Sequence, residues 1–223
     1  MPPLLLFDID LTLIATSGAG RLALDRAFER VTGVPAATAG IRFDGRTDRA
    51  IIAEVLQRCG SPAARFPEVR DAYLEELPAA LREQGGEILP GVEPLLDALA
   101  RELPGIGLAT GNLRAGARAK LGHFGLWHRF AAGGFGDDHT ERAGLVRAGI
   151  AALAAAIGAS PDPASAVVIG DTPLDVAAAR AAGARSVAVA TGRYTAHDLS
   201  AAGADAVLPG FDDLDRALAA LLA

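Results

Sequence analysis

Two aspartates follow the first apolar run of the chain, in the stretch "LLLFDID" at 4–10. The run is typical of a strand that is buried on both faces. Because alternate residues of a strand point to the same side, Asp8 and Asp10 are expected to converge where the strand ends. Two carboxylates about 4 Å apart repel by about 4 kcal/mol at an effective dielectric constant near 20. A proton, a separating turn or a cation must offset this repulsion, and Mg²⁺ suits such oxygen ligands best.

A second acidic cluster follows another apolar run, in "VVIGDTPLD" at 167–175. Asp171 comes directly after the predicted strand, and Asp175 lies in the first turn of a predicted helix, where it would also favour the helix dipole. Open α/β sheets bind their ligands at the carboxyl edge of their strands. The sequence therefore predicts a metal site formed by Asp8, Asp10, Asp171 and Asp175.

A third polar stretch, "LATGN" at 108–112, ends a predicted strand with Thr110. Gly111 and Asn112 begin the next turn, so a hydroxyl, backbone N–H groups and an amide lie near a helix N-terminus. These groups are suited to phosphate oxygens, although a plain helix cap would look similar.

The elements that must position these residues alternate along the chain. Six apolar runs predict strands at 4–10, 105–112, 130–136, 164–171, 185–192 and 204–210. Helical patterns lie between them at 91–104, 112–126, 142–158, 172–183 and 212–223. Such alternation predicts an α/β fold with a doubly wound parallel-sheet core.

The alternation is interrupted after the first strand. Residues 16–86 contain helical patterns at 20–33, 47–60 and 66–86, the last bent or broken near Pro78, and no convincing strand. We therefore predict a core domain of residues 1–15 and 87–223 and a small all-helical cap of residues 16–86. The cap is expected to lie over the carboxyl edge of the sheet.

The composition excludes several classes of protein. The chain has a net charge of −6 and scattered arginines, which disfavours nucleic-acid binding. Its one cysteine, Cys59, excludes an internal disulfide and a thiolate zinc site, and its four histidines show no paired ligand spacing. No apolar run approaches membrane-spanning length, and no signal peptide is recognised at the start. We expect a soluble cytoplasmic protein, a monomer or homodimer, with no membrane partner.

The motifs "DIDLT", "ATGN" and "GDTPLD", in this order and spacing, resemble those of the haloacid dehalogenase superfamily of aspartate-nucleophile phosphatases. The resemblance covers essentially the whole chain, because a helical insertion after the first strand matches the small-cap type of the superfamily. The segment "FDGRTDRAI" at 43–51 is similar to phosphoglycolate phosphatase-like members.

The resemblance implies a role for each acidic residue. Asp8 would attack phosphorus and carry an aspartyl-phosphate, while Asp10 would act as general acid and then general base. Asp8, the backbone carbonyl of Asp10 and Asp171 would bind Mg²⁺, and Asp175 would support the site.

The resemblance also implies binding roles for neutral residues. Thr110 and Asn112, with the backbone of Gly111 between them, would hold the transferring phosphoryl oxygens. Thr12 would brace the loop that follows the first strand.

Members of the superfamily need a basic side chain between the second and third motifs. Arg142 lies where small-cap members place this cation, whereas Lys120, the only lysine, lies earlier in the chain. We favour Arg142; the alternative is that Lys120 supplies the charge and Arg142 is a solvated residue at a helix start. Arg46 in the cap would contact the substrate, unless it lies on the surface.

The function predicted from these motifs is Mg²⁺-dependent hydrolysis of a small phosphate monoester, phosphoglycolate-like or a sugar phosphate, through an aspartyl-phosphate. A 2-haloacid dehalogenase is one alternative, but halide leaves without a proton and would not need Asp10. A sugar phosphomutase is another, but the cap carries neither the histidine nor the lysine of such enzymes. A non-catalytic phosphate-binding module would be expected to lack at least one of the acids.

Overall fold

The core is a six-stranded sheet in a computed structural model that describes residues 2–137, 139 and 141–223. Its strands are β1 (Leu4–Phe7), β4 (Gly107–Ala109), β5 (Ala132–Gly134), β6 (Ala166–Gly170), β7 (Arg185–Val189) and β8 (Ala206–Leu208). They are ordered β5-β4-β1-β6-β7-β8, and every neighbouring pair is parallel. The strand order reverses between β1 and β6, so the predicted doubly wound fold is confirmed.

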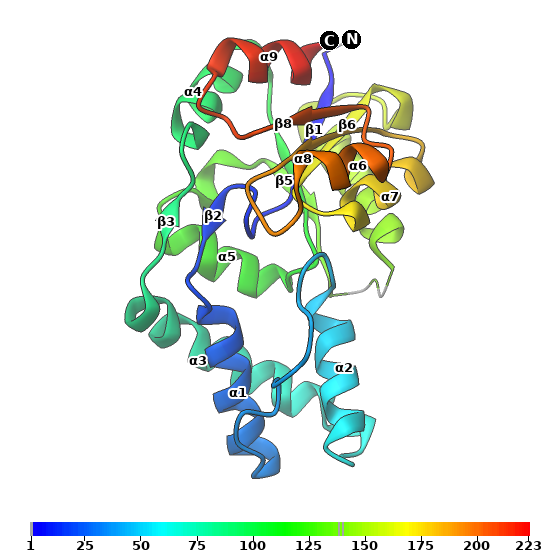
Figure 1. Ribbon diagram of the computed structural model, residues 1–223. Coiled ribbons are helices and arrows are strands. Elements are labelled where there is room, and N and C mark those ends of the chain that lie inside the picture. The colour runs from blue at the N-terminus through cyan, green and yellow to red at the C-terminus, as the bar shows by residue number, and fades with distance from the viewer. Residues whose placement is uncertain (1, 138, 140) are drawn as a thin grey trace.

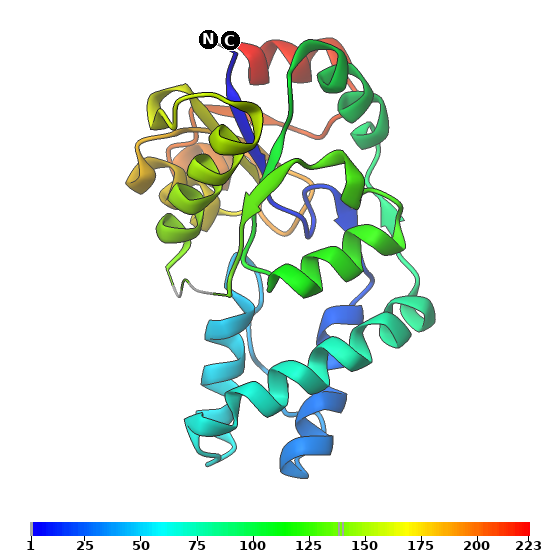
Figure 2. The ribbon, with the colours of Figure 1, turned by 180° about the vertical axis from the view of Figure 1, so that it is seen from behind.

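Helices cover both faces of this sheet (Figures 1 and 2). Because side chains alternate along β1, Leu5 and Phe7 join a buried cluster with α4 (Val92–Glu102), α5 (Arg114–His123) and α9 (Leu214–Leu222). Leu4 and Leu6 point to the other face, where they pack with α6 (Arg142–Ile157) and α7 (Pro173–Ala182). The central strand is therefore apolar throughout, as a strand buried on both faces must be.

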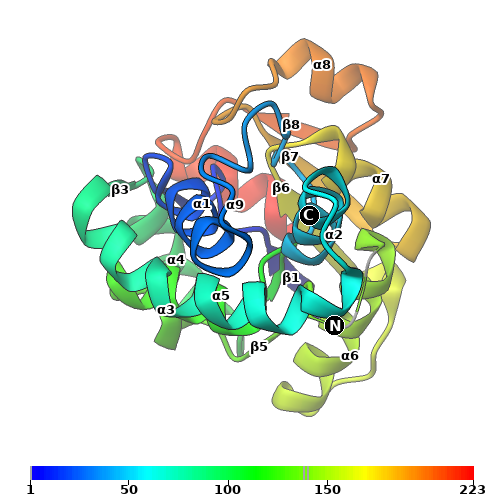
Figure 3. The same cartoon turned by 90° about the horizontal axis from the view of Figure 1, so that it is seen from below.

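Three further helices form a separate layer below the carboxyl edge of the sheet, α1 (Ala19–Thr32), α2 (Asp48–Arg58) and α3 (Phe66–Gln84). They pack around their own buried apolar cluster, and Figure 3, viewed from below, shows them in front of the strands. The helix α3 continues through Pro78, so of the two predicted alternatives a break is absent, and a bend stays a prediction. Leu77, Ala80 and Leu81 flank the proline and are buried, and this packing offsets the lost backbone hydrogen bond.

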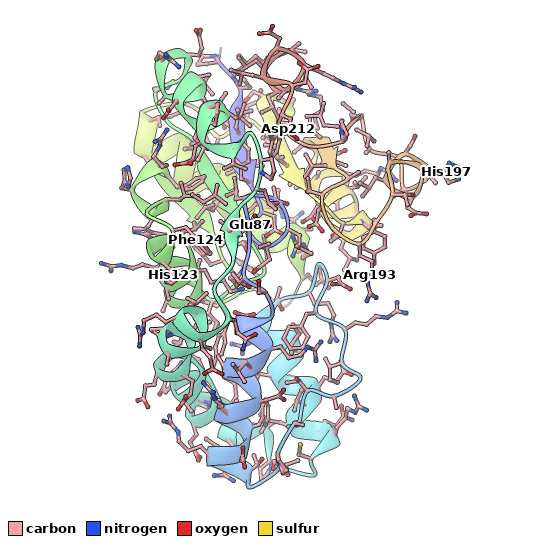
Figure 4. The ribbon with its side chains drawn as sticks, turned by 60° about the vertical axis from the view of Figure 1, so that its left-hand side comes forward. Glu87, His123, Phe124, Arg193, His197 and Asp212 are labelled. Atoms are coloured by element: carbon pink, nitrogen blue, oxygen red, sulfur yellow. The ribbon has the colours of Figure 1, made fainter. Side chains whose placement is uncertain are left out.

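A two-stranded antiparallel ribbon joins the sheet to these helices. It consists of β2 (Ile14–Ala15) and β3 (Glu87–Ile88), and Figure 4 shows Glu87 at the junction. Gly86 has a φ of 125°, and a Cβ atom there would meet the carbonyl oxygen of Ala15. The ribbon lies next to the two predicted boundaries of the cap, residues 16 and 86. The division of the chain into a core domain and a cap domain itself stays a prediction.

The remaining elements are short. They are α8 (Ala196–Ala201) and the 3₁₀ helices η1 (Ala63–Arg65), η2 (Trp127–Arg129) and η3 (Pro163–Ser165). Thr195 and Asp198 form a capping box at the start of α8, which the apolar pattern does not indicate. None of the described helices combines the length and the apolar character that a membrane-spanning helix requires.

Candidate active site

The candidate site is a cavity of about 410 Å³ at the point where the strand order reverses. Asp8, Thr110 and Asp171 follow the carboxyl ends of β1, β4 and β6, and all three line this cavity. The helical layer provides the opposite wall with residues from 16–21 and 43–51. The position agrees with the usual ligand site of doubly wound sheets.

Three buried acidic residues lie close together beside the cavity, and two of them, Asp8 and Asp171, line it. One carboxylate oxygen each of Asp8, Asp171 and Asp175 can be chosen so that all three lie within 4.8 Å of one another. Asp175 is fixed by a capping box, in which its Oδ2 accepts hydrogen bonds from the Thr172 N–H at 3.1 Å and the Thr172 hydroxyl at 2.7 Å. A Cβ atom at Gly170 would overlap the Asp175 carboxyl group, so glycine is required where β6 ends.

The electrostatics of this cluster favour a bound cation. Burial is the main cause that raises the pKa of Asp8 to about 6 and that of Asp171 to about 8; neighbouring carboxylates add to these shifts, and the charge of Arg142 opposes them. Arg142 alone therefore does not offset the negative charge of the cluster enough to keep the Asp171 carboxylate ionised at neutral pH. Clustered carboxylate oxygens are the ligands that Mg²⁺ prefers, so these residues fit that ion.

Arg142, the first residue of α6, faces this cluster. Its Nη2 lies 3.4 Å from Asp8 Oδ2 and forms an ion pair with Asp175 Oδ1. Burial acts to lower the pKa of Arg142, but Asp175 and Asp8 outweigh it, and the pKa is raised. The side chain is only 9% exposed, so Arg142 is not the solvated residue of the alternative interpretation.

Lys120 reaches the same cavity from α5. Its Nζ donates hydrogen bonds to Asp10 Oδ1 at 2.8 Å, to Asp10 Oδ2 at 2.7 Å and to Asn112 Oδ1 at 2.7 Å. Burial acts to lower the pKa of Lys120, but the charges of Asp10 and Asp48 raise it on balance. Lys120 and Arg142 were expected as alternatives, whereas the structure places both in the site, on different carboxylates.

The loop after β4 links Asp10 to the helical layer. The Asn112 side-chain amide donates to Asp10 Oδ2 and to Thr110 Oγ1, both at 2.8 Å. The Asp48 N–H donates to the Gly111 carbonyl at 2.8 Å, and Asp48 Oδ2 accepts from the Leu113 N–H at 2.9 Å. This contact brings the helical layer directly against the predicted phosphate-binding loop.

Two further residues predicted for the site, Thr12 and Arg46, form no hydrogen bond or ion pair with the acidic cluster in the described structure. Thr12 is fully buried, and its hydroxyl has no partner among the described residues; it lies in the tight loop after β1, in which Leu11 has a φ of 57°. Arg46 lines the cavity, but its Nη1 pairs with Glu54 at 2.6 Å. Its predicted contact with substrate stays a prediction.

Sequence reasoning missed three residues of the site. Asp48 and Arg21 line the cavity from the helical layer, and Gly192, in the loop after β7, lies so close to Asp171 that a Cβ atom would overlap its carboxylate. Arg21 and Gly192 belong to no recognised motif. Asp48 lies within the segment at 43–51, and its place just after the helix N-cap Thr47 was the signal available in the sequence. Figure 4 shows His123 at the end of α5 and His197 projecting from α8, both with solvent-facing positions.

The comparisons with known proteins agree with this geometry. Residues 5–189 match a family model described as haloacid dehalogenase-like hydrolase. A "Probable phosphatase IndB" of Dickeya dadantii is 29% identical over 230 residues, covering 100% of this chain and 96% of that protein. A "Phosphoglycolate phosphatase" of Caulobacter vibrioides is 30% identical over 220 residues, covering 97% of this chain and 90% of that protein.

Solved structures of similar fold include a hydrolase from Pseudomonas syringae, with a TM-score of 0.74, 24% identity and coverage of 99% of this chain and 100% of that one. CbbY from Rhodobacter sphaeroides, in complex with phosphate, has a TM-score of 0.71 and 24% identity, with coverage of 96% of each chain. At these identities the solved structures show the fold.

Proposed function

Because the chain belongs to the haloacid dehalogenase-like hydrolase family, we propose that it is a Mg²⁺-dependent phosphatase that hydrolyses a small phosphate monoester through an aspartyl-phosphate on Asp8. The family predicted from the sequence motifs is confirmed. The observation that carries the proposal is the close group of Asp8, Asp171 and Asp175, of which Asp8 and Asp171 line a partly enclosed cavity, with Arg142 against the group.

In the first step, an Asp8 carboxylate oxygen attacks phosphorus and the bond to the leaving alkoxide breaks. The alkoxide takes a proton from the Asp10 carboxyl group. In the second step, Asp10 takes a proton from water, which attacks phosphorus, so inorganic phosphate leaves and the Asp8 carboxylate is restored.

Asp8, Asp171 and the backbone carbonyl of Asp10 would hold Mg²⁺, with Asp175 in support, and the bound ion would neutralise phosphoryl oxygens. Arg142 adds a fixed positive charge beside Asp8, which offsets the repulsion between the carboxylate and an anionic substrate.

Asp10 is well placed for proton transfer. Its side chain is 38% exposed toward the cavity, while Lys120 and Asn112 hold its oxygens in one orientation. The Thr110 hydroxyl and the N–H groups of the loop after β4 would hold phosphoryl oxygens. Asp10 also disfavours dehalogenation, and residues 16–86 lack the histidine and lysine expected of a phosphomutase cap.

The experiment is release of inorganic phosphate from p-nitrophenyl phosphate and from phosphoglycolate, with Mg²⁺ and after removal of metal by EDTA. We expect turnover that requires Mg²⁺ and is abolished in Asp8→Asn, with the far-UV circular dichroism unchanged. Asp71→Asn, at an exposed aspartate of α3, is the control and should retain wild-type turnover. Turnover in Asp8→Asn, or full activity with EDTA, would contradict the proposal.

A further inference from the structure

The cationic side chains that line the catalytic cavity differ in how their charge is offset. They are Arg21, Arg46, Lys120 and Arg142. Arg46 forms an ion pair with Glu54, Lys120 with Asp10, and Arg142 with Asp8. Within the described part of the chain, no carboxylate forms an ion pair with Arg21. Arg21 therefore differs from the other three lining cations, because no carboxylate among the described residues neutralises its charge.

Arg21 is nevertheless held firmly, by neutral groups. Its Nη1 donates to the Thr38 carbonyl at 2.7 Å and to the Thr38 hydroxyl at 3.1 Å, and its Nη2 donates to the Ile41 carbonyl at 2.8 Å. Its guanidinium lies over the ring of Phe43, 4.1 Å from the ring centroid. These contacts fix the position of the group but leave its full positive charge, and a guanidinium has more donors than these bonds use.

The nearby acidic residues are already engaged elsewhere. Asp25, one turn along α1, accepts from the Thr38 N–H at 2.8 Å, and Asp44 lies 3.6 Å from the Arg193 guanidinium. Asp48 accepts from the Leu113 N–H, as described above. The first turn of α1 carries no acidic side chain. A preorganised arginine without a carboxylate partner, in a partly enclosed cavity, is a site for an anion.

We propose that Arg21 determines specificity by binding a second anionic group, a carboxylate or a phosphate, on the alcohol part of the ester substrate. The inference rests on the proposed phosphatase function. The phosphoryl group would lie at Asp8 and the second anion at the cap wall, with the apolar side chains of Phe43 and Ile51 lining the space around the connecting carbons. Binding at this remote group would hold the helical layer closed over the reacting phosphorus.

The test compares kcat/KM for matched esters: phosphorylated hydroxy acids of two to four carbons, diol bisphosphates of the same lengths, and alkyl phosphates without a second charge. The variants are Arg21→Met and Arg21→Lys. The control is Arg26→Met, because Arg26 lies on the same helix but pairs with Glu83 at 2.7 Å. The two anionic series separate a carboxylate from a phosphate as the preferred group.

We expect the wild type and Arg26→Met to prefer an anionic ester of one chain length. Arg21→Met should lose about 10- to 100-fold in kcat/KM for that ester, the loss expected for a hydrogen bond to a charged group. It should change kcat/KM for the alkyl phosphate by less than about threefold, and Arg21→Lys should restore part of the preference.

Equal losses for charged and uncharged esters would show that Arg21 only supports the Thr38–Phe43 loop, and the inference would be wrong. The absence of any wild-type preference for anionic esters would also overturn it. If the wild type hydrolyses no phosphate ester, the proposed function fails instead. In that case, calorimetry measures the affinities of phosphoglycolate and ethyl phosphate for the wild type and for Arg21→Met. We expect Arg21→Met to bind phosphoglycolate more weakly than the wild type does and to bind ethyl phosphate equally well. Equal affinities of the two proteins for phosphoglycolate would refute the inference.

Discussion

Replacing Arg142 by glutamine would remove the positive charge that faces both Asp8 and Asp175 and leave a shorter, neutral polar side chain in its place. At the observed 3.4 Å, unit charges on Arg142 and Asp8 attract by about 5 kcal/mol at an effective dielectric constant near 20. Part of this attraction offsets the cost of burying the pair, so the loss in transition-state stabilisation should be smaller. Removal of one such preorganised group costs about 10²- to 10³-fold in rate.

The assay is kcat/KM for p-nitrophenyl phosphate at saturating Mg²⁺, because this leaving group needs little help from a general acid. Arg147→Gln is the matched control, since Arg147 lies on the same helix, is exposed and donates to the Ala181 carbonyl at 3.0 Å. We expect Arg142→Gln to lose about 10²- to 10³-fold and Arg147→Gln to change kcat/KM by less than about threefold.

The result that would refute this reasoning involves the second cation. If Arg142→Gln stays within about threefold of wild type while Lys120→Met is inactive, Lys120 and not Arg142 serves the nucleophile. A melting experiment in EDTA gives an independent check, because loss of Arg142 leaves Asp8 and Asp175 buried without their partner and should lower the Tm.

Three further predictions concern the neighbouring groups. Lys120→Met should leave Asp10 and Asn112 without their shared donor and destabilise the protein by about 1–3 kcal/mol, or about 2–4 °C in Tm per kcal/mol; an unchanged Tm would contradict this role. Gly192→Ala should place a methyl group against the Asp171 carboxylate and weaken Mg²⁺ binding measured by calorimetry, and unaltered affinity would argue against the placement of that loop. Burial raises the pKa of Asp171 to about 8, so its contribution to the stability of metal-free protein is fully present below about pH 4, the unfolded value, and is lost as pH rises through about 8. Because Mg²⁺ binds the ionised carboxylate, the rise in Tm on adding Mg²⁺ should be larger at pH 8 than at pH 6, and a smaller rise would be the opposite of what the site requires.

The core of the fold could be predicted because its signals are local. Each parallel strand is a short apolar run followed by a helical pattern, so all six strands and their order of appearance are visible in the sequence. The ribbon of β2 and β3 could not be found in this way, since strands of two residues have no periodicity. The continuity of α3 through Pro78 depends on packing with other helices, which outweighs the local preference of proline to end a helix.

The residues of the site also fall into those that a local sequence pattern predicts and those that depend on how the elements pack. Asp8, Thr110 and Asp171 follow strand ends, and the topology alone brings them together. The place of Lys120 depends on how α5 lies across the loop after β1, which no local pattern records, so the sequence presented it as a competitor of Arg142. In the sequence, Arg21 resembles any other arginine of an amphipathic helix; only the structure shows that no carboxylate of the described residues pairs with it.

The most direct test of the central claim is a rapid-quench experiment with radiolabelled phosphate ester, followed by mapping of the label in acid-stabilised peptides. We predict label that appears within the first turnover on the peptide containing Asp8, decays as phosphate is released, and is absent from Asp8→Asn. Label on a different residue, or turnover in which no protein-bound phosphoryl group forms at any time, would contradict the account.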